Sequence, residues 1–379
     1  MTAGGARDPR ARRLLFVGTN RGPGGTESHL ITLALGMADA GYTVAAVVRP
    51  DDVIARALAA DGRVALHYAA FETNRNRQAR RDLTEACRTV RPSWMIGNFA
   101  REFWPLSIVA RLQGVPLALF LHIQKIPRLS APFYPWLASR FILPSRYLQE
   151  WVVRRRGMPR WRTSVLYNPI NVDHFRPDAA RREATRAALG FAPDDVVVGF
   201  VGRFERQKGV LVLEAALERL MAEAPNVRAL WVGGGELASR IDGALTSSRF
   251  AKRHVRQPWS GDVATYYPAM DILVFPSTRR ESFGRVAAEA QASGVPVVGS
   301  RVGGIPETIR ENESGLLVTP EDPTSLGDAI LRLVNDPALR ARMGAVGRSQ
   351  AVERFATPHI AEEFAKLLGL AAPRPLPTV

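Results

Sequence analysis

Two acidic residues lie eight positions apart where a helix is expected to begin. Glu281 and Glu289 frame the segment SFGRVAA, which follows the apolar run 272–275. A helix that starts near Phe283 or Gly284 would carry Glu289 about one and a half turns along it. Both carboxylates could then accept hydrogen bonds from sugar hydroxyls, while the N–H groups of the helix start bind a phosphate between them. The plainer alternative is a capping Glu followed by a surface Glu.

Two cations lie in an earlier strand-to-helix loop. Arg203 and Lys208 follow the apolar run 196–201 and precede a helical pattern. The planar fork of Arg and the point charge of Lys both suit a diphosphate. Arg206, between them, fits a solvated side chain better.

Glycine-rich segments follow several other apolar runs. GTNRGPGGTE at 18–27 allows close backbone approach and leads into a helix start that could meet an anion. It has neither the Lys-Ser/Thr pair of a Walker A loop nor GxGxxG spacing, so a flexible turn capped by Thr26 is the alternative. Segments 233–236 and 299–307 repeat the order of strand, glycine and helix.

The elements that must position these loops form two series of short apolar runs separated by helical patterns. Strands are expected at 14–18, 43–48, 64–68, 94–98, 117–121, 141–143 and 164–166, and then at 196–201, 228–232, 272–275, 295–299 and 316–318. This order predicts an α/β protein with two doubly wound parallel sheets. Because such sheets bind ligands at the carboxyl ends of their strands, the loops above should hold the chemistry.

A Pro- and Asn-rich segment, NPINVDHFRP at 168–177, suits a linker between two domains. We expect an N-terminal Rossmann-like domain over 1–175 and a C-terminal one over 176–355. A C-terminal helix within 356–379 is expected to pack back on the N-terminal domain and to end in a frayed tail.

Charge and cysteine content narrow the class of protein. The chain has 379 residues and a net charge of +15, and residues 1–175 hold 25 of the 51 Lys and Arg but 12 of the 36 Asp and Glu. This excess suggests an anionic partner for the first half, namely a membrane surface, a phosphorylated lipid or nucleic acid; an Arg-rich solvated face is the alternative. The single cysteine, Cys87, cannot form an internal disulfide, which favours a cytoplasmic location.

Neither a targeting signal nor a membrane span is expected from the apolar runs. The run 14–17 is too short for a secretory signal, and no stretch of about 18 apolar residues occurs. No Cys and His cluster has the spacing of a metal site.

Taken together, the motifs resemble the retaining glycosyltransferases of family 4. They are, in order, GGTE at 24–27, LYNPINVDHFRP at 166–177, VGRFERQKG at 201–209, GGGE at 233–236, the segment 266–300 that contains Glu281 and Glu289, GGIPETI at 303–309 and GLLV at 315–318. The resemblance covers most of the chain. It implies the GT-B architecture, in which two Rossmann-like domains face each other across a cleft that holds a nucleotide-sugar donor.

The resemblance also implies catalytic roles. Arg203 and Lys208 would bind the donor diphosphate, and Glu281 would contact the donor sugar. His122, which ends an expected strand, would lie near the transferred sugar. Retention of anomeric configuration is implied, with no cofactor and no obligatory metal, because positive side chains and helix dipoles neutralise the leaving group.

The remaining donor contacts follow the same resemblance. Glu289 would hold the ribose hydroxyls. Phosphate would be cradled by the backbone near Gly24, Gly25, Ser282, Phe283, Gly284 and Val286. The segment 255–261 departs from the family pattern where a turn near the nucleobase is usual, and Gln257 or Trp259 would contact the base there, or Trp259 would simply pack.

The acceptor is expected to bind the first half. Aromatic residues accompany the arginines there, with tryptophans at Trp94, Trp104, Trp136, Trp151 and Trp161. This pattern favours a lipid-linked or surface-polysaccharide glycan acceptor and peripheral contact with the anionic inner face of the cell membrane. The alternatives are a soluble natural-product acceptor, a nucleotide-sugar epimerase, and a basic nucleic-acid-binding protein, although no nucleic-acid-binding module is recognisable.

Overall fold

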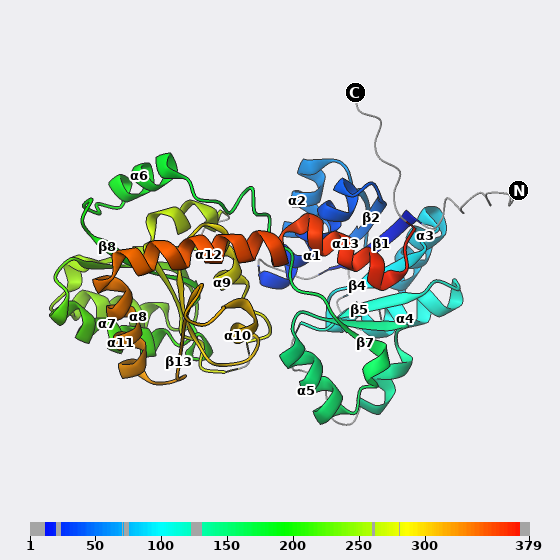
Figure 1. Ribbon diagram of the computed structural model, residues 1–379. Coiled ribbons are helices and arrows are strands. Elements are labelled where there is room, and N and C mark those ends of the chain that lie inside the picture. The colour runs from blue at the N-terminus through cyan, green and yellow to red at the C-terminus, as the bar shows by residue number, and fades with distance from the viewer. Residues whose placement is uncertain are drawn as a thin grey trace, which may run out of the picture. The chain divides into compact units, whose positions relative to one another are not determined.

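The computed structural model describes residues 12–19, 24–69, 71, 76–122, 131–259, 262–279 and 281–371. The chain divides into two compact units (Figure 1). The N-terminal unit comprises the residues up to Pro169 and those from Thr357 onward, and the C-terminal unit comprises Ile170–Ala356. The boundary after Pro169 lies within the Pro- and Asn-rich segment at 168–177.

The N-terminal unit is built on a parallel sheet with the strand order β3-β2-β1-β4-β5-β6-β7. Its strands are β1 (Arg13–Gly18), β2 (Thr43–Val48), β3 (Ala65–Tyr68), β4 (Trp94–Gly97), β5 (Leu117–Phe120), β6 (Arg140–Leu143) and β7 (Thr163–Val165). Each corresponds to an expected strand. Since β1 lies between β2 and β4, the order reverses at β1, which is the point where doubly wound sheets bind ligands.

Helices cover both faces of this sheet. They are α1 (Gly25–Asp39), α2 (Val53–Asp61), α3 (Arg77–Val90), η2 (Ala100–Glu102), α4 (Phe103–Leu112), η3 (Ala131–Trp136), α5 (Arg146–Arg156), η4 (Arg160–Arg162) and α13 (Thr357–Leu368). Alternate residues of β1 point to opposite faces, so Leu15 and Val17 join one core cluster while Leu14 and Phe16 join the other. The second cluster includes Phe364 of α13, and α13 lies along α1 (Figure 1).

The C-terminal unit has a parallel sheet with the order β10-β9-β8-β11-β12-β13. Its strands are β8 (Val196–Arg203), β9 (Val227–Gly234), β10 (His254–Gln257), β11 (Ile272–Phe275), β12 (Val297–Ser300) and β13 (Gly315–Val318). Strand β10 was not expected, because three of its four residues, His254, Arg256 and Gln257, are polar or charged and it forms a partly exposed edge strand. Residues 255–257, the first part of the departing segment 255–261, therefore belong to a strand, and Gln257 is its last residue.

The helices of this unit pack on both faces of its sheet. They are α6 (Ala179–Ala188), η5 (Arg206–Lys208), α7 (Val210–Glu223), α8 (Ala238–Ser247), η6 (Ala251–Arg253), η7 (Val263–Thr265), η8 (Tyr267–Ala269), α9 (Arg285–Ala292), α10 (Ile305–Thr308), α11 (Pro323–Asn335) and α12 (Pro337–Phe355). Gly284 precedes α9 with φ 107°, a left-handed conformation that suits glycine. Helix α9 therefore begins one to two residues later than expected.

None of the helices in the described ranges combines the length and the hydropathy of a membrane span. Within those ranges, His, Cys, Asp and Glu side chains do not gather in threes that could hold a metal ion.

Candidate active site

A half-buried ion pair lies where two neighbouring strands of the C-terminal unit end. Strand β8 leads into Lys208 and strand β11 leads into Glu281. Nζ of Lys208 lies 2.6 Å from Oε2 of Glu281, and the two side chains are 20% and 16% exposed. The hydroxyl of Ser277 donates to the same oxygen at 3.3 Å. The structure thus brings together one cation and one carboxylate that the sequence placed in separate loops.

The Lys208 ammonium is held on a second side as well. Its Nζ lies 5.5 Å from the ring centroid of Phe275, the last residue of β11, as in a cation–π contact. An ammonium has three N–H donors, so Lys208 can hold Glu281 and still donate to an incoming anion.

Close backbone contact explains why the two loops meet. A Cβ atom at Gly209 would lie 1.9 Å from the carbonyl oxygen of Pro276, and Gly209 has φ 70°. The N–H of Thr278 donates to the carbonyl oxygen of Gln207 at 2.9 Å. The β8 loop is therefore packed against the β11 loop without an intervening side chain.

A third loop supports Glu281 from the other side. The N–H of Gly304 donates to the carbonyl oxygen of Glu281 at 2.9 Å, and a Cβ atom at Gly303 would lie 2.1 Å from that oxygen. Phe283 is buried and packs edge-to-face on Phe355 with centroids 5.4 Å apart. The segment from Glu281 to Gly284, which includes Ser282, is thus anchored just before α9, with Val286 in the first turn of that helix.

Arg203 lies at the same sheet edge but has a different partner. Its Nη1 lies 2.7 Å from Oε1 of Glu205, and its side chain is 63% exposed. Gln257 ends β10, two strands away from β8, and its carbonyl oxygen accepts from Nη1 of Arg256 at 3.0 Å. Neither residue contacts the Lys208–Glu281 pair through a bond found in the described residues.

Glu289 lies inside α9 with partners of its own. Its Oε1 accepts from Nε of Arg285 at 2.7 Å and its Oε2 accepts from the hydroxyl of Tyr267 at 2.9 Å. Burial, and then the charge of Glu289, raise the pKa of Tyr267 well above its usual value. The i, i+4 spacing of Arg285 and Glu289 was visible in the sequence, but Tyr267 gave no signal because it is 22 residues away.

In the N-terminal unit, His122 follows β5 and joins a chain of hydrogen bonds at the carboxyl ends of the strands. Nδ2 of Asn98 donates to the carbonyl oxygen of Thr26 at 2.9 Å, which orients the amide so that its Oδ1 accepts from Nε2 of His122 at 2.9 Å. Gly24 is the N-cap of α1 and Gly25 is its first residue, so both directly precede Thr26. Asn98 thereby links His122 to the glycine segment, a role that sequence reasoning missed.

The environment of His122 keeps its imidazole neutral. The ring stacks on Phe120 at 5.7 Å and meets His29 edge-to-face at 4.7 Å. Burial lowers the pKa of His122 from 6.5 to about 3. At neutral pH His122 therefore offers a hydrogen-bonding group and not a charge.

Glu102 is a buried acid near this edge that the sequence did not single out. One of its oxygens, Oε1, accepts from the N–H of Thr19 at 2.6 Å and from the Thr19 hydroxyl at 2.7 Å. The side chain is fully buried, and burial raises the pKa of Glu102 to about 7. These hydrogen bonds fix the position of Thr19, the residue that follows β1.

Glu102 and His122 are expected to make opposite contributions to the pH dependence of stability. Glu102 binds its proton in the folded chain up to about pH 7 but only to about pH 4.5 when unfolded, so its contribution falls as the pH rises through this window. His122 is neutral when folded down to about pH 3 but protonated below 6.5 when unfolded, so its contribution falls as the pH drops from 6.5 to 3.

Melting temperatures measured between pH 4 and 8 test this for the Glu102→Gln variant, which keeps an oxygen for Thr19. As the pH rises from 4.5 to 7, the melting temperature of the variant is expected to rise relative to that of the native chain. His122→Gln serves as a control, because its difference from the native chain should change mainly on the acid side of pH 6.5. A Glu102→Gln difference that does not vary with pH would contradict the argument.

Comparison with known families agrees with this arrangement. Residues 181–350 match the family described as "Glycosyl transferases group 1", and residues 23–174 match "Glycosyltransferase Family 4". The two matches fall largely in the C-terminal and N-terminal units, respectively.

Curated relatives include D-inositol 3-phosphate glycosyltransferases of Streptomyces and Nocardioides species. The Streptomyces bingchenggensis enzyme is 35% identical over 58% of this chain and 50% of its own length. The Nocardioides sp. enzyme is 35% identical over 72% of this chain and 64% of its own length. The chain spans about half the length of the first curated relatives it matches.

Solved structures share the fold. The Anabaena protein HepE in complex with UDP has a TM-score of 0.83 and 22% identity, over 94% of this chain and 99% of HepE. A Rickettsia africae glycosyltransferase also has a TM-score of 0.83, with 17% identity over 94% and 97% of the two chains. Two parallel-sheet Rossmann-like units, the two family matches and the motif order agree, and the chain belongs to the family 4 glycosyltransferases of the GT-B fold.

Proposed function

We propose that this protein transfers a sugar from a nucleotide-diphosphate sugar to an acceptor hydroxyl with retention of anomeric configuration. The observation that carries the proposal is the Lys208–Glu281 pair, 2.6 Å apart, at the joined ends of β8 and β11. A cation for the diphosphate and an acceptor for sugar hydroxyls stand side by side, next to the N-terminus of α9.

The leaving group would be stabilised by fixed positive charge. Lys208 would donate to the diphosphate, and Arg203, which is 63% exposed, would leave Glu205 to join it. The N–H groups at the start of α9, near Phe283, Gly284 and Val286, would bind phosphate oxygens as well. These charges would take the place of an obligatory metal ion.

Glu281 would orient a hydroxyl of the donor sugar, since its carboxylate is held by Lys208 and Ser277. The acceptor hydroxyl would lose its proton to an oxygen of the departing diphosphate, so we assign no side-chain base. From the N-terminal unit, neutral His122 would lie beside the transferred sugar, and the backbone at Gly24 and Gly25 would approach phosphate.

The donor itself is testable directly. HepE has been solved with UDP and with UDP-glucose, which supports a uridine nucleotide among the candidates. A thermal-shift screen of UDP-, GDP-, ADP- and dTDP-sugars should show one class that raises the melting temperature, because a ligand of the folded state stabilises it by mass action. The absence of a shift with all four classes would contradict the proposal.

Product analysis separates transfer from epimerisation. Incubation of the stabilising donor with and without a membrane extract should release nucleotide only when acceptor is present, and the product should keep the donor's anomeric configuration by NMR. Conversion of the donor to another nucleotide sugar without acceptor would instead support an epimerase of the same architecture.

Glu289 would hold the ribose hydroxyls, and its two partners predict how it is held. The Tyr267→Phe variant removes the donor to Oε2 of Glu289, so the buried carboxylate is less well positioned. We expect nucleotide affinity, measured by calorimetry, to fall about fivefold to tenfold while kcat falls less. The control Tyr266→Phe alters the neighbouring, less buried tyrosine and should leave affinity unchanged. Equal affinities for Tyr267→Phe and the native chain would count against this role of Glu289.

The acceptor we favour is a lipid-linked or surface-polysaccharide glycan presented at the cytoplasmic face of the membrane. The support is the composition of the first 175 residues, which hold 25 Lys and Arg against 12 Asp and Glu. Transfer into the lipid phase of a membrane extract would support this acceptor, whereas transfer only to water-soluble aglycones would favour the natural-product alternative.

A further inference from the structure

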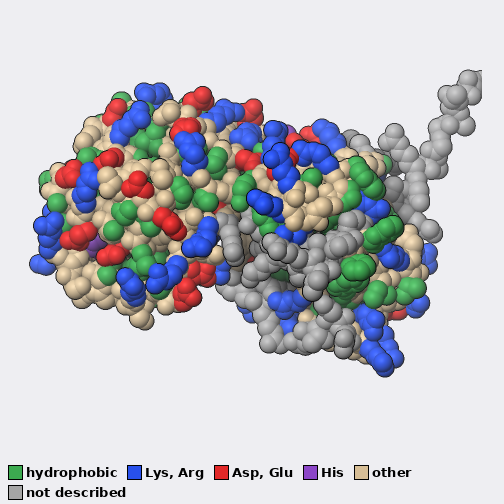
Figure 2. All heavy atoms as spheres, turned by 90° about the horizontal axis from the view of Figure 1, so that it is seen from below, with side chains coloured by type: hydrophobic (Ala, Val, Ile, Leu, Met, Phe, Trp, Pro, Cys, Tyr) green, Lys and Arg blue, Asp and Glu red, His purple; other side chains and the backbone are tan. Residues whose placement is uncertain are grey.

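Large apolar side chains are exposed together on one part of the N-terminal unit. They belong to α4, η3 and η4 and are Trp104, Ile108, Leu112, Phe133, Trp136 and Trp161. We call these six residues the aromatic surface. Leu112 is 77% exposed, Trp161 72% and Trp136 68%, so the apolar area is open to its surroundings. The space-filling view shows hydrophobic side chains gathered on this unit with Lys and Arg side chains beside them (Figure 2).

Helix α4 is apolar on two sides, which is unusual for a surface helix. Phe103, Leu106 and Val109 are buried against the sheet. Trp104 and Ile108, four residues apart, form a second apolar face that points outward. An exposed apolar face of this kind marks an interaction site, because a surface helix normally presents polar residues to water.

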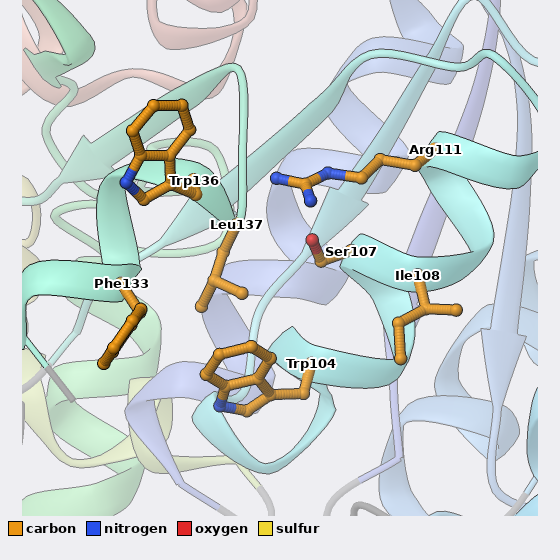
Figure 3. Close-up of a pocket in the computed structure, with 7 residues that line it drawn as sticks. All are labelled: Trp104, Ser107, Ile108, Arg111, Phe133, Trp136 and Leu137. Atoms are coloured by element: carbon orange, nitrogen blue, oxygen red, sulfur yellow. The ribbon is translucent and has the colours of Figure 1, made fainter.

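The aromatic surface is hollowed between α4 and η3. A hollow of about 250 Å³ is lined by Trp104, Ser107, Ile108, Arg111, Phe133, Trp136 and Leu137 (Figure 3). Figure 3 shows the Arg111 side chain reaching from α4 toward η3, with its guanidinium directed to the side of Trp136. A second hollow, of about 350 Å³, shares Arg111 and Trp136 with the first and extends to Trp161 and Arg162.

The charge of these hollows has one sign. Arg111 lines both, and Arg162 lines the second, where its guanidinium lies 4.6 Å from the ring centroid of Trp161. None of the described residues that line either hollow is acidic. Tryptophan rings beside arginines suit the boundary between acyl chains and headgroups, where the ring is half buried and the guanidinium meets phosphate.

We propose that the aromatic surface docks this protein on an anionic phospholipid bilayer, with Trp104 and Trp136 entering the headgroup region and Arg111 binding lipid phosphate. A bilayer fits better than a protein partner because apolar rings and uniform positive charge occur in the same small area. The inference locates the membrane contact of the proposed function, but vesicle binding does not depend on transferase activity, so each can fail separately.

The test is flotation of the full chain with phosphatidylcholine vesicles, either neutral or with about one third phosphatidylglycerol. The native protein should float with the anionic vesicles and remain below with the neutral ones. The double variant Trp104→Ser/Trp136→Ser and the single variant Arg111→Glu should each weaken binding about tenfold or more. Arg111 is exposed and forms no ion pair with another described residue, so Arg111→Glu is expected to fold normally even if the double variant does not.

Matched controls change similar side chains elsewhere. Tyr68→Ser removes a 53% exposed ring from β3, at the opposite edge of the same sheet, and Arg332→Glu reverses an exposed charge on α11. Both should float as the native protein does. The proposal would be overturned if the native protein bound neutral and anionic vesicles equally, or if Arg111→Glu bound anionic vesicles as well as the native protein does. So would a native dimer in sedimentation that the double variant abolishes without any vesicle binding, because the surface would then join two copies of the chain.

Discussion

Replacing Lys208 with alanine is expected to lower kcat/KM for the nucleotide sugar about a thousandfold. The variant removes the cation whose Nζ lies 2.6 Å from Glu281, so the diphosphate loses a donor and Glu281 loses the partner that orients it. Because charge on the diphosphate grows as the sugar bond breaks, the effect should fall on kcat more than on KM. Steady-state kinetics with the donor found by thermal shift would measure it.

Arg206→Ala provides the matched control in the same loop. Arg206 carries the same charge two residues earlier and is exposed, as expected of a solvated side chain. Its removal should change kcat/KM less than about threefold, because only the long-range attraction of an exposed charge for the diphosphate is lost. Lys208→Arg should retain part of the activity, since the charge remains while the geometry changes. Similar losses for Arg206→Ala and Lys208→Ala would mean that net charge, and not the ion pair, carries donor binding.

Replacing Gly303 with alanine is also expected to lower activity strongly, although Gly303 offers no functional group. A Cβ atom there would lie 2.1 Å from the carbonyl oxygen of Glu281, and the residue has φ 61°. The variant must therefore displace the Glu281 loop or move the backbone at 303. We expect activity to fall at least about a hundredfold and stability to fall by about 3 kcal/mol.

Gly243→Ala is expected to change stability in the opposite direction, by stabilising the chain. Gly243 lies inside α8, and a Cβ atom there meets nothing within 4 Å. The same substitution should stabilise the chain by about 0.5–1 kcal/mol and leave kinetics unchanged. Urea unfolding together with donor kinetics distinguishes the two cases. Native-like activity in Gly303→Ala would show that the loop tolerates the shift, and would refute the view that the GGIPE segment holds Glu281 in place.

These two predictions concern different layers of one arrangement. In the proposed function Lys208 and Glu281 would supply the chemistry, while Gly209, Gly303 and Gly304 allow the backbones of three loops to approach closely. The glycines act only because main-chain atoms of Pro276, Glu281 and Ser282, respectively, occupy the space that a side chain would need. The glycine-bearing motifs near the site thus position the ionisable residues.

Local sequence was sufficient to predict the fold and the family and to select the candidate site residues. Strands buried on both faces are continuous apolar runs, so both parallel sheets could be predicted, with β10 the exception because its edge position leaves it polar. The strand-to-helix loops could be identified because parallel sheets place them at one edge. The order of the motifs then indicated the family.

The partners of the site residues depended on tertiary structure. Lys208 meets Glu281 across 73 residues, Tyr267 meets Glu289 across 22, and Asn98 meets His122 across 24. The aromatic surface likewise required the fold, since α4, η3 and η4 are separate in the chain and meet only when the sheet is formed. Residue type and spacing express local preferences for strand, turn and helix. Which carboxylate receives which donor, and which apolar side chains stay exposed, is decided by packing between segments that the sequence keeps far apart.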